Sequence, residues 1–173
     1  PNFVISMKYG EGDFHVFPDV NPLLFYGEHQ KIVEFQTRRE YKGAGLHPYF
    51  VGWEYERYFK KLKDVGNLIG TSVWCQTGGL SRYKSLTFLE NSSVWNELNT
   101  YATIKILKDG HTPETAVLVF FQQYRKELAS NEMVLFLRLF TQHFQQLLYV
   151  KGFSDRPFYF KKLRVPPTLW IFW

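Results

Sequence analysis

The chain has 173 residues, a net charge of +5 and an aromatic content of 19%. A hydrophobic fraction of 45% excludes a mainly disordered chain, and the length suits about one domain. No run of about 20 apolar residues is present, so the sequence predicts neither a membrane-spanning helix nor a membrane partner. The single cysteine excludes a disulfide framework and a cysteine-rich zinc site, and the five histidines lack metal-ligand spacing. No metal or cofactor is therefore expected.

The two ends of the chain are unusual. The sequence begins at Pro1, directly before an apolar run, and it finishes with the aromatic and apolar residues 169–173. Natural termini are usually polar and frayed. We therefore expect this sequence to be a piece of a longer protein, and any signal peptide would lie in the part before Pro1.

The first half of the chain has the pattern of a parallel sheet. Three short apolar runs rich in β-branched residues predict strands, at residues 2–7, 31–37 and 67–75. Pro18 and Pro22 predict a long loop between the first two strands. Apolar residues at spacings of three and four predict an amphipathic helix at residues 51–63, between the second and third strands. Strands that alternate with helices or long crossovers indicate parallel pairing.

The second half of the chain is predicted to be helical. Capping residues and apolar periodicity define three helices, at residues 92–108, 112–128 and 130–150. The third of these helices carries an apolar stripe that suits either a core or a dimer face, formed by Met133, Leu135, Phe136, Leu139, Phe140, Phe144, Leu147 and Leu148. We expect a domain boundary near residue 88, with a partial barrel at 1–88 and an α-helical region at 89–173.

Two acidic residues follow the first two predicted strands. Asp13 and Glu40 each lie in a loop that contains glycine, just beyond a strand. Barrel enzymes place their chemistry at the carboxyl ends of their strands, and hydrolysis of a glycosidic bond requires a pair of carboxyl groups. Taken singly, Asp13 is also a common turn residue, and Glu40 could pair with Arg38 or Arg39. Taken together, at the ends of neighbouring parallel strands, the two acids would face one crevice.

Other polar and aromatic residues lie near the same strand ends. Trp74 and Gln76 end the third predicted strand, where they could stack on a sugar ring and bind a hydroxyl, or serve as core and loop residues. His15 lies two positions beyond Asp13 and could contact the same site. Glu34, inside the second strand, is interpreted as structural support that needs a partner such as Lys8 or Arg38.

These motifs resemble those of a known family. The spacings of Lys8, Gly10, Asp13 and Phe14, and of Glu34, Phe35, Gln36, Glu40, Tyr41 and Gly43, are similar to the late-barrel motifs of the α-glucuronidases of glycoside hydrolase family 67. Asn99, Tyr101 and Ala102, with the run at 112–116, resemble the start of that family's helical C-terminal domain. The likeness covers roughly residues 3–128.

The resemblance implies a fold and a mechanism. The fold would be the C-terminal portion of a (β/α)8 TIM barrel, here its last three strands, followed by an α-helical region. The reaction would be hydrolysis with inversion, in which Asp13 and Glu40 match the carboxylates assigned to the general base. The general acid would lie on an earlier strand outside this chain, so we expect the fragment alone to be inactive. From their chemistry, Lys8 and Arg38 could contact a uronate carboxylate, because arginine suits that planar group, whereas the family's contacts to that carboxylate lie mainly in the part outside this chain.

The sequence thus predicts an inverting glycoside hydrolase that acts on an oligosaccharide or glycoside substrate. A second interpretation is a non-catalytic carbohydrate-binding or scaffolding module that keeps an aromatic groove but does not need Asp13 or Glu40. A nucleic-acid binder is a third interpretation, but only the net charge motivates it, since the basic residues form no long run. A homodimer formed through the C-terminal helices is also predicted.

Overall fold

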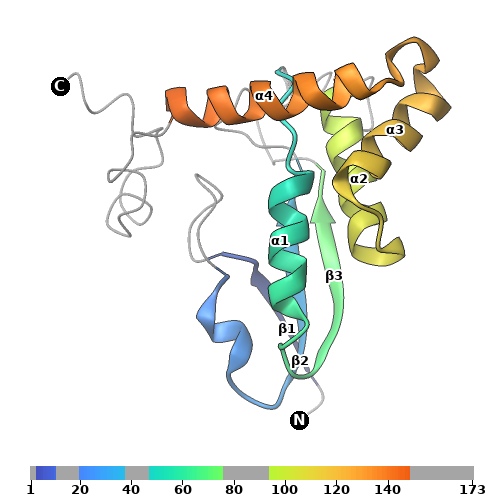
Figure 1. The fold of residues 1–173 in the computed structure, drawn as a ribbon. Coiled ribbons are helices and arrows are strands. Elements are labelled where there is room, and N and C mark those ends of the chain that lie inside the picture. The colour runs from blue at the N-terminus through green and yellow to red at the C-terminus, as the bar shows by residue number, and fades with distance from the viewer. Residues whose placement is uncertain (1–2, 11–19, 38–46, 76–93, 149–173) are drawn as a thin grey trace, which may run out of the picture.

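The computed structural model describes residues 3–10, 20–37, 47–75 and 94–148. In this part the chain forms a three-stranded parallel sheet in the order β1-β2-β3, with strands β1 (Val4–Lys8), β2 (Gln30–Gln36) and β3 (Leu68–Trp74). Four α-helices accompany the sheet (Figure 1): α1 (Gly52–Leu62), α2 (Val94–Asp109), α3 (Pro113–Tyr124) and α4 (Asn131–Leu148). The predicted strands and their parallel pairing are confirmed.

One face of the sheet is covered by α1. Lys31, Val33 and Phe35 alternate along β2 and are buried. From α1, Tyr55 and Tyr58 pack into the same core cluster as Val33 and Phe35. The rings of Tyr55 and Phe35 meet edge to face with their centroids 4.9 Å apart, a favoured aromatic geometry. The amphipathic pattern predicted for residues 51–63 therefore marks the helix that covers this face.

The connection from β1 to β2 is the predicted long loop, and it contains a short 3-10 helix at Pro22–Phe25. Asn21 accepts a hydrogen bond from Leu23 N and donates one through Nδ2 to Lys8 O. The backbone N–H of Asn21 also donates to Tyr9 O at 2.8 Å. These contacts attach the loop to the carboxyl end of β1 and place Leu24, which is fully buried, in the same core.

The helices after β3 form a second core. It contains ten buried residues contributed by α2, α3, α4 and the segment before α1: Phe50, Leu98, Ala102, Ile106, Ala116, Val117, Phe120, Phe121, Val134 and Leu137. The predicted helix at 112–128 begins correctly, since Thr112 caps it and Pro113 is its first residue. Its predicted end was wrong, because Arg125 leaves the helical region at φ −153° and Lys126–Leu128 form a separate 3-10 turn.

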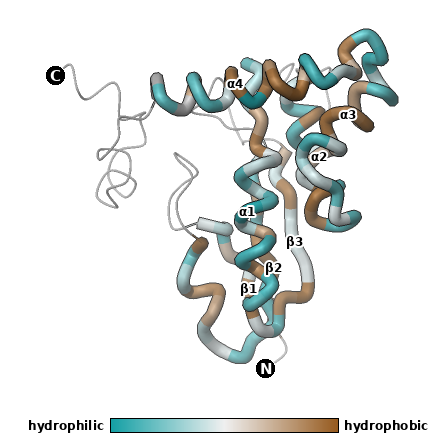
Figure 2. The backbone as a smooth tube through the Cα atoms, in the orientation of Figure 1, coloured by the Kyte–Doolittle hydropathy of each residue, from teal (hydrophilic) through white to brown (hydrophobic). Residues whose placement is uncertain are grey.

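Helix α4 lies across the carboxyl end of the sheet (Figure 1). Val134 and Leu137 face the second core, whereas Leu135, Phe136 and Leu139 are exposed. Figure 2 shows this mixture of hydrophobic and hydrophilic positions along the helix. Neither Val134 nor Leu137 belongs to the predicted apolar stripe, of which Met133 and Phe144 are partly buried against the two cores. The prediction of the core face of this helix is therefore wrong in part, and a homodimer through these helices stays a prediction. Within the described residues, no helix has the length and apolarity required to cross a membrane.

Candidate functional site

The carboxyl ends of the three strands meet at one edge of the sheet. Gly10 follows β1 and Thr37 follows β2, and these are the last described residues before the segments that carry Asp13 and Glu40. The two strands are hydrogen-bonded neighbours, with Lys8 beside Glu34. Five of the predicted site residues lie outside the described residues: Asp13, His15, Arg38, Glu40 and Gln76. Lys8 and Trp74 are described.

The face of the sheet opposite α1 is polar near the carboxyl ends. The strand register sets Lys8, Glu34 and Ser72 side by side on β1, β2 and β3. The hydroxyl of Ser6 donates a hydrogen bond to Glu34 Oε1 at 2.7 Å. The sequence predicts that Glu34 is structural support, with Lys8 or Arg38 as its partner. Ser6 supplies a hydrogen bond that was not predicted, and Lys8 is the neighbour of Glu34 in register.

One step nearer the edge, Gln36 and Trp74 are partners on β2 and β3. Trp74 is 45% exposed, so the alternative that Trp74 is a core residue is wrong. Its indole ring can therefore contact a ligand at the edge of the sheet. Gln36 is only 2% exposed, and among the described residues its side-chain oxygen has no hydrogen-bond partner. A carboxylate, an ammonium group and hydroxyls beside an exposed indole can bind a polyhydroxylated ring through its polar edge and its apolar face.

The backbone at this edge is held firmly in place. Thr37 donates two hydrogen bonds to Trp74 O, from its backbone N–H at 2.8 Å and from its hydroxyl at 3.0 Å. The same hydroxyl lies 2.8 Å from Thr100 Oγ1 on α2. Asn96, also on α2, donates through Nδ2 to Cys75 O at 3.0 Å. Helix α2 therefore fixes the ends of both β2 and β3.

A third contact from α2 holds the chain just before α1. Asn99 Nδ2 donates to Tyr49 O at 2.8 Å, and Asn99 Oδ1 accepts from Val51 N at 3.0 Å. Asn99 is 4% exposed, and Tyr49 and Val51 are buried. The segment that carries Glu40 is thus anchored at both sides, by Thr37 before it and by the Asn99 contacts after it.

This polar network is not among the residues predicted from the sequence. Its signal is nevertheless present, because Asn96, Asn99, Thr100 and Thr103 recur at spacings of three and four and so share one face of α2. All four are buried. A stripe of uncharged polar residues beside the buried Leu98, Ala102 and Ile106 indicates that this helix face binds polar groups of a neighbouring element, since buried polar groups are almost always hydrogen-bonded.

The described residues contain no cluster of three or more His, Cys, Asp or Glu side chains that could hold a metal ion. Comparisons with family models, with curated proteins and with solved structures found no match to this chain. A functional interpretation therefore depends on the sheet edge and on the motifs that flank it.

Proposed function

We propose that this chain is part of an inverting glycoside hydrolase of the α-glucuronidase type, and that it carries the general-base side of the active site. The main support is that β1 and β2 are parallel neighbours, so that the segments with Asp13 and Glu40 both leave the sheet at its carboxyl edge. Adjacent strands lie about 4.8 Å apart, which allows two carboxylates above them to share one substrate.

The sheet also supports the barrel interpretation. Its strands follow in sequence order, α1 covers one face, and the opposite face carries the polar row of Lys8, Glu34 and Ser72. In a (β/α)8 barrel the helices lie outside and the other face of the sheet lines the interior. We propose that the described strands are three consecutive strands of such a barrel.

In the proposed mechanism, Asp13 and Glu40 form the site that activates water. One carboxylate takes a proton from a water molecule as that water attacks the anomeric carbon. A general acid on an earlier strand protonates the leaving oxygen, and inversion requires about 6.5–9.5 Å between acid and base. Two nearby carboxylates disfavour each other's ionisation, so Asp13 and Glu40 would titrate as a coupled pair.

The remaining predicted residues would bind the substrate. Lys8 and Arg38 would bind anionic or hydroxyl groups, and Trp74 would stack on a sugar ring. His15 and Gln76 would contact hydroxyls beside them. Lys8 and Trp74 both lie at the carboxyl end of the sheet, and Trp74 exposes its ring. These positions support a role of both residues in substrate binding.

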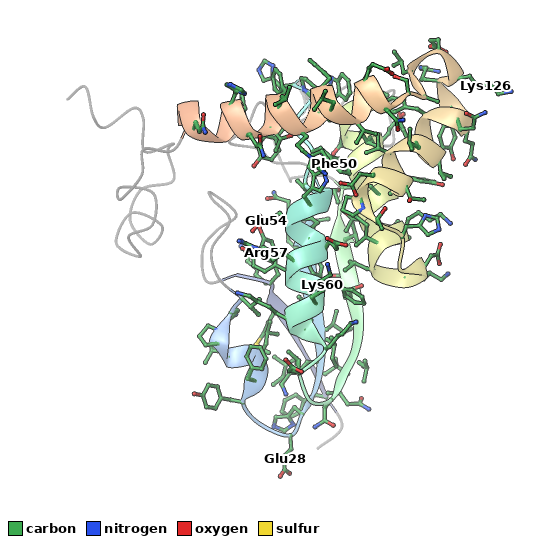
Figure 3. The ribbon with its side chains drawn as sticks, in the orientation of Figure 1. Glu28, Phe50, Glu54, Arg57, Lys60 and Lys126 are labelled. Atoms are coloured by element: carbon green, nitrogen blue, oxygen red, sulfur yellow. The ribbon has the colours of Figure 1, made fainter. Side chains whose placement is uncertain are left out.

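The test is the activity of the complete enzyme with one carboxylate replaced by its amide. We expect Asp13→Asn and Glu40→Gln each to lower turnover by about 10²–10⁴-fold, the usual loss of a general base. Glu28→Gln is the matched control, because Glu28 is exposed at the opposite end of the sheet (Figure 3). Near-full activity in either amide variant would show that the pair is not catalytic.

The alternative, a non-catalytic carbohydrate-binding module, is favoured by one observation, the exposed indole of Trp74. A binding titration separates the two functions. A module of that kind would keep its affinity for oligosaccharide in both amide variants, and the complete wild-type protein would release no product from glycosides.

A further inference from the structure

A cavity of about 410 Å³ lies between the beginning of α1 and the middle of α4, away from the polar face of the sheet. It is lined by Tyr49, Phe50, Trp53, Glu54, Arg138, Thr141 and Gln142. Figure 3 shows Phe50 and Glu54 at the end of α1 that faces α4. Cavities of about 300–1,000 Å³ with apolar walls and a few polar groups are typical of small-molecule sites. We propose that this cavity, the α1–α4 pocket, binds a neutral sugar unit.

The aromatic wall of the pocket is rigid. Phe50 is 1% exposed, and its ring meets Trp53 edge to face with the centroids 4.8 Å apart. The backbone N–H of Phe50 donates to Thr141 Oγ1 at 3.0 Å, which joins the wall to α4. Gly52 leaves room for the Phe50 ring, since a Cβ at that position would lie 2.3 Å from it. Rigid aromatic surfaces bind without a large loss of side-chain entropy.

Trp53 is held by α3 and α4. Its Nε1 donates a hydrogen bond to Glu114 Oε1 at 2.7 Å. Arg138 forms an ion pair with the same oxygen of Glu114, and its guanidinium lies over the Trp53 ring, 5.2 Å from the centroid. The indole is thus fixed by a hydrogen bond at its edge and by a cation over its face.

The charges around the pocket are already paired. Arg138 is neutralised by Glu114, and Glu54 forms an ion pair with Arg57. Burial raises the pKa of Glu114, but hydrogen bonds from Trp53 and from the backbone, together with Arg138, outweigh it and hold the pKa below its usual value. Burial lowers the pKa of Arg57, but the Glu54 carboxylate outweighs that effect and raises it. An anion or a cation would therefore find no unpaired counter-charge among the described lining groups.

The ligand class follows from this combination. Trp53 is the partly exposed ring of the lining and supplies an apolar surface, with the buried Tyr49 and Phe50 beside it. Glu54 retains acceptor capacity, and the exposed amide of Gln142 can both donate and accept. A neutral pyranose has an apolar face and hydroxyls at its edge, so it matches each of these groups. Helix α1 begins on the side of the carboxyl edge, where the Asn99 contacts fix Tyr49 and Val51. The pocket would then hold a sugar unit of the substrate chain that lies away from the cleaved bond. The choice of a sugar as the ligand rests on the proposed function, but binding in the pocket does not require Asp13 or Glu40.

The test is calorimetric titration of the protein with cellotriose and xylotriose, and with trigalacturonate as the anionic probe. We expect saturable binding of a neutral trisaccharide that Trp53→Ala weakens by roughly tenfold or more, the usual effect of removing a central aromatic contact. Because Trp53→Ala could disturb the fold, Gln142→Trp provides a second variant, which fills the pocket from an exposed position. It should weaken binding to a similar extent.

Two controls separate this pocket from the proposed active site. Glu28→Gln, at the opposite end of the sheet, should leave binding to the α1–α4 pocket unchanged. Asp13→Asn should lower turnover while this binding is retained. Three results would overturn the proposal. They are saturable binding that neither Trp53→Ala nor Gln142→Trp weakens, tighter binding of trigalacturonate than of the neutral trisaccharides, and no binding of either neutral trisaccharide. Loss of turnover in Asp13→Asn with this binding retained would support both proposals, whereas full turnover with binding retained would remove only the proposed function.

Discussion

Asn99 provides a sensitive test of how helix α2 holds the edge of the sheet. In Asn99→Ala, Tyr49 O and Val51 N lose their side-chain partner, and both residues are at most 3% exposed. Each buried polar group left without a partner costs about 1–3 kcal/mol. Alanine recovers roughly 0.5–0.7 kcal/mol of helix propensity. We therefore expect the free energy of unfolding to fall by about 2–5 kcal/mol, a large part of a typical total of about 5–15 kcal/mol.

Urea denaturation measures this loss. With a slope of about 2 kcal/mol/M, the midpoint should fall by about 1–2.5 M. Gln122→Ala removes the same kind of side chain from an exposed position on α3 and should change the free energy by less than about 0.5 kcal/mol. Asn99→Asp keeps the acceptor for Val51 N but sets a carboxylate oxygen against Tyr49 O, so it should be strongly destabilising at neutral pH. If Asn99→Ala lowered the midpoint no more than Gln122→Ala does, the Asn99 contacts would not hold this edge.

Two further predictions concern the helical core and the ion pair beside the α1–α4 pocket. Leu137→Ala should lower the free energy of unfolding by about 2–5 kcal/mol because Leu137 is fully buried. Leu139→Ala should change it by less than about 0.5 kcal/mol because the side chain of Leu139 is 46% exposed. Equal losses of stability in urea denaturation would show that α4 presents a different face to the core. The pKa of Glu114 is lowered in the folded protein. Its stabilising effect should therefore be complete above the unfolded carboxyl pKa of about 4.3 and be lost as the pH falls through the lower folded value. Urea midpoints of wild type and Glu114→Gln should converge in that acid range, and a constant difference down to about pH 2 would contradict the lowered pKa.

The order of helices and strands could be predicted because the apolar residues have clear periods. The alternation of Lys31, Val33 and Phe35 marks the buried face of β2, and the spacing of Tyr55 and Tyr58 marks the buried face of α1. The early end of α3 could not be predicted. Residues 125–128 contain neither glycine nor proline, so no local breaker indicates that Arg125 leaves the helical region.

The exposure of individual aromatic residues was harder to predict. Trp74 and Phe50 both follow apolar residues in the sequence, yet Trp74 is 45% exposed and Phe50 is 1% exposed. The difference comes from tertiary packing: Phe50 lies between Gly52, Trp53 and α4, whereas Trp74 ends a strand on the polar face of the sheet. Local sequence contains no information on which distant helix covers a given ring.

The candidate site could be predicted only in part for a similar reason. The positions of Asp13 and Glu40 after two strands follow from the sequence, and the parallel pairing of those strands is confirmed. The contacts that fix the edge involve side chains separated by many residues in the sequence, such as Thr37 with Thr100 and Asn99 with Tyr49. Short-range patterns predict a polar helix face, but they do not identify the backbone groups that it binds.

The proposed function depends most directly on the closeness of the side chains at positions 13 and 40. In a Cys75→Ser background, the double variant Asp13→Cys/Glu40→Cys should be joined rapidly by a short bifunctional thiol reagent under native conditions. The control pair Asp13→Cys/Glu28→Cys spans the carboxyl and amino ends of the sheet and should react only at its single sites. Rapid cross-linking of the first pair alone is the predicted result, and equal or absent cross-linking in both pairs would contradict a shared site.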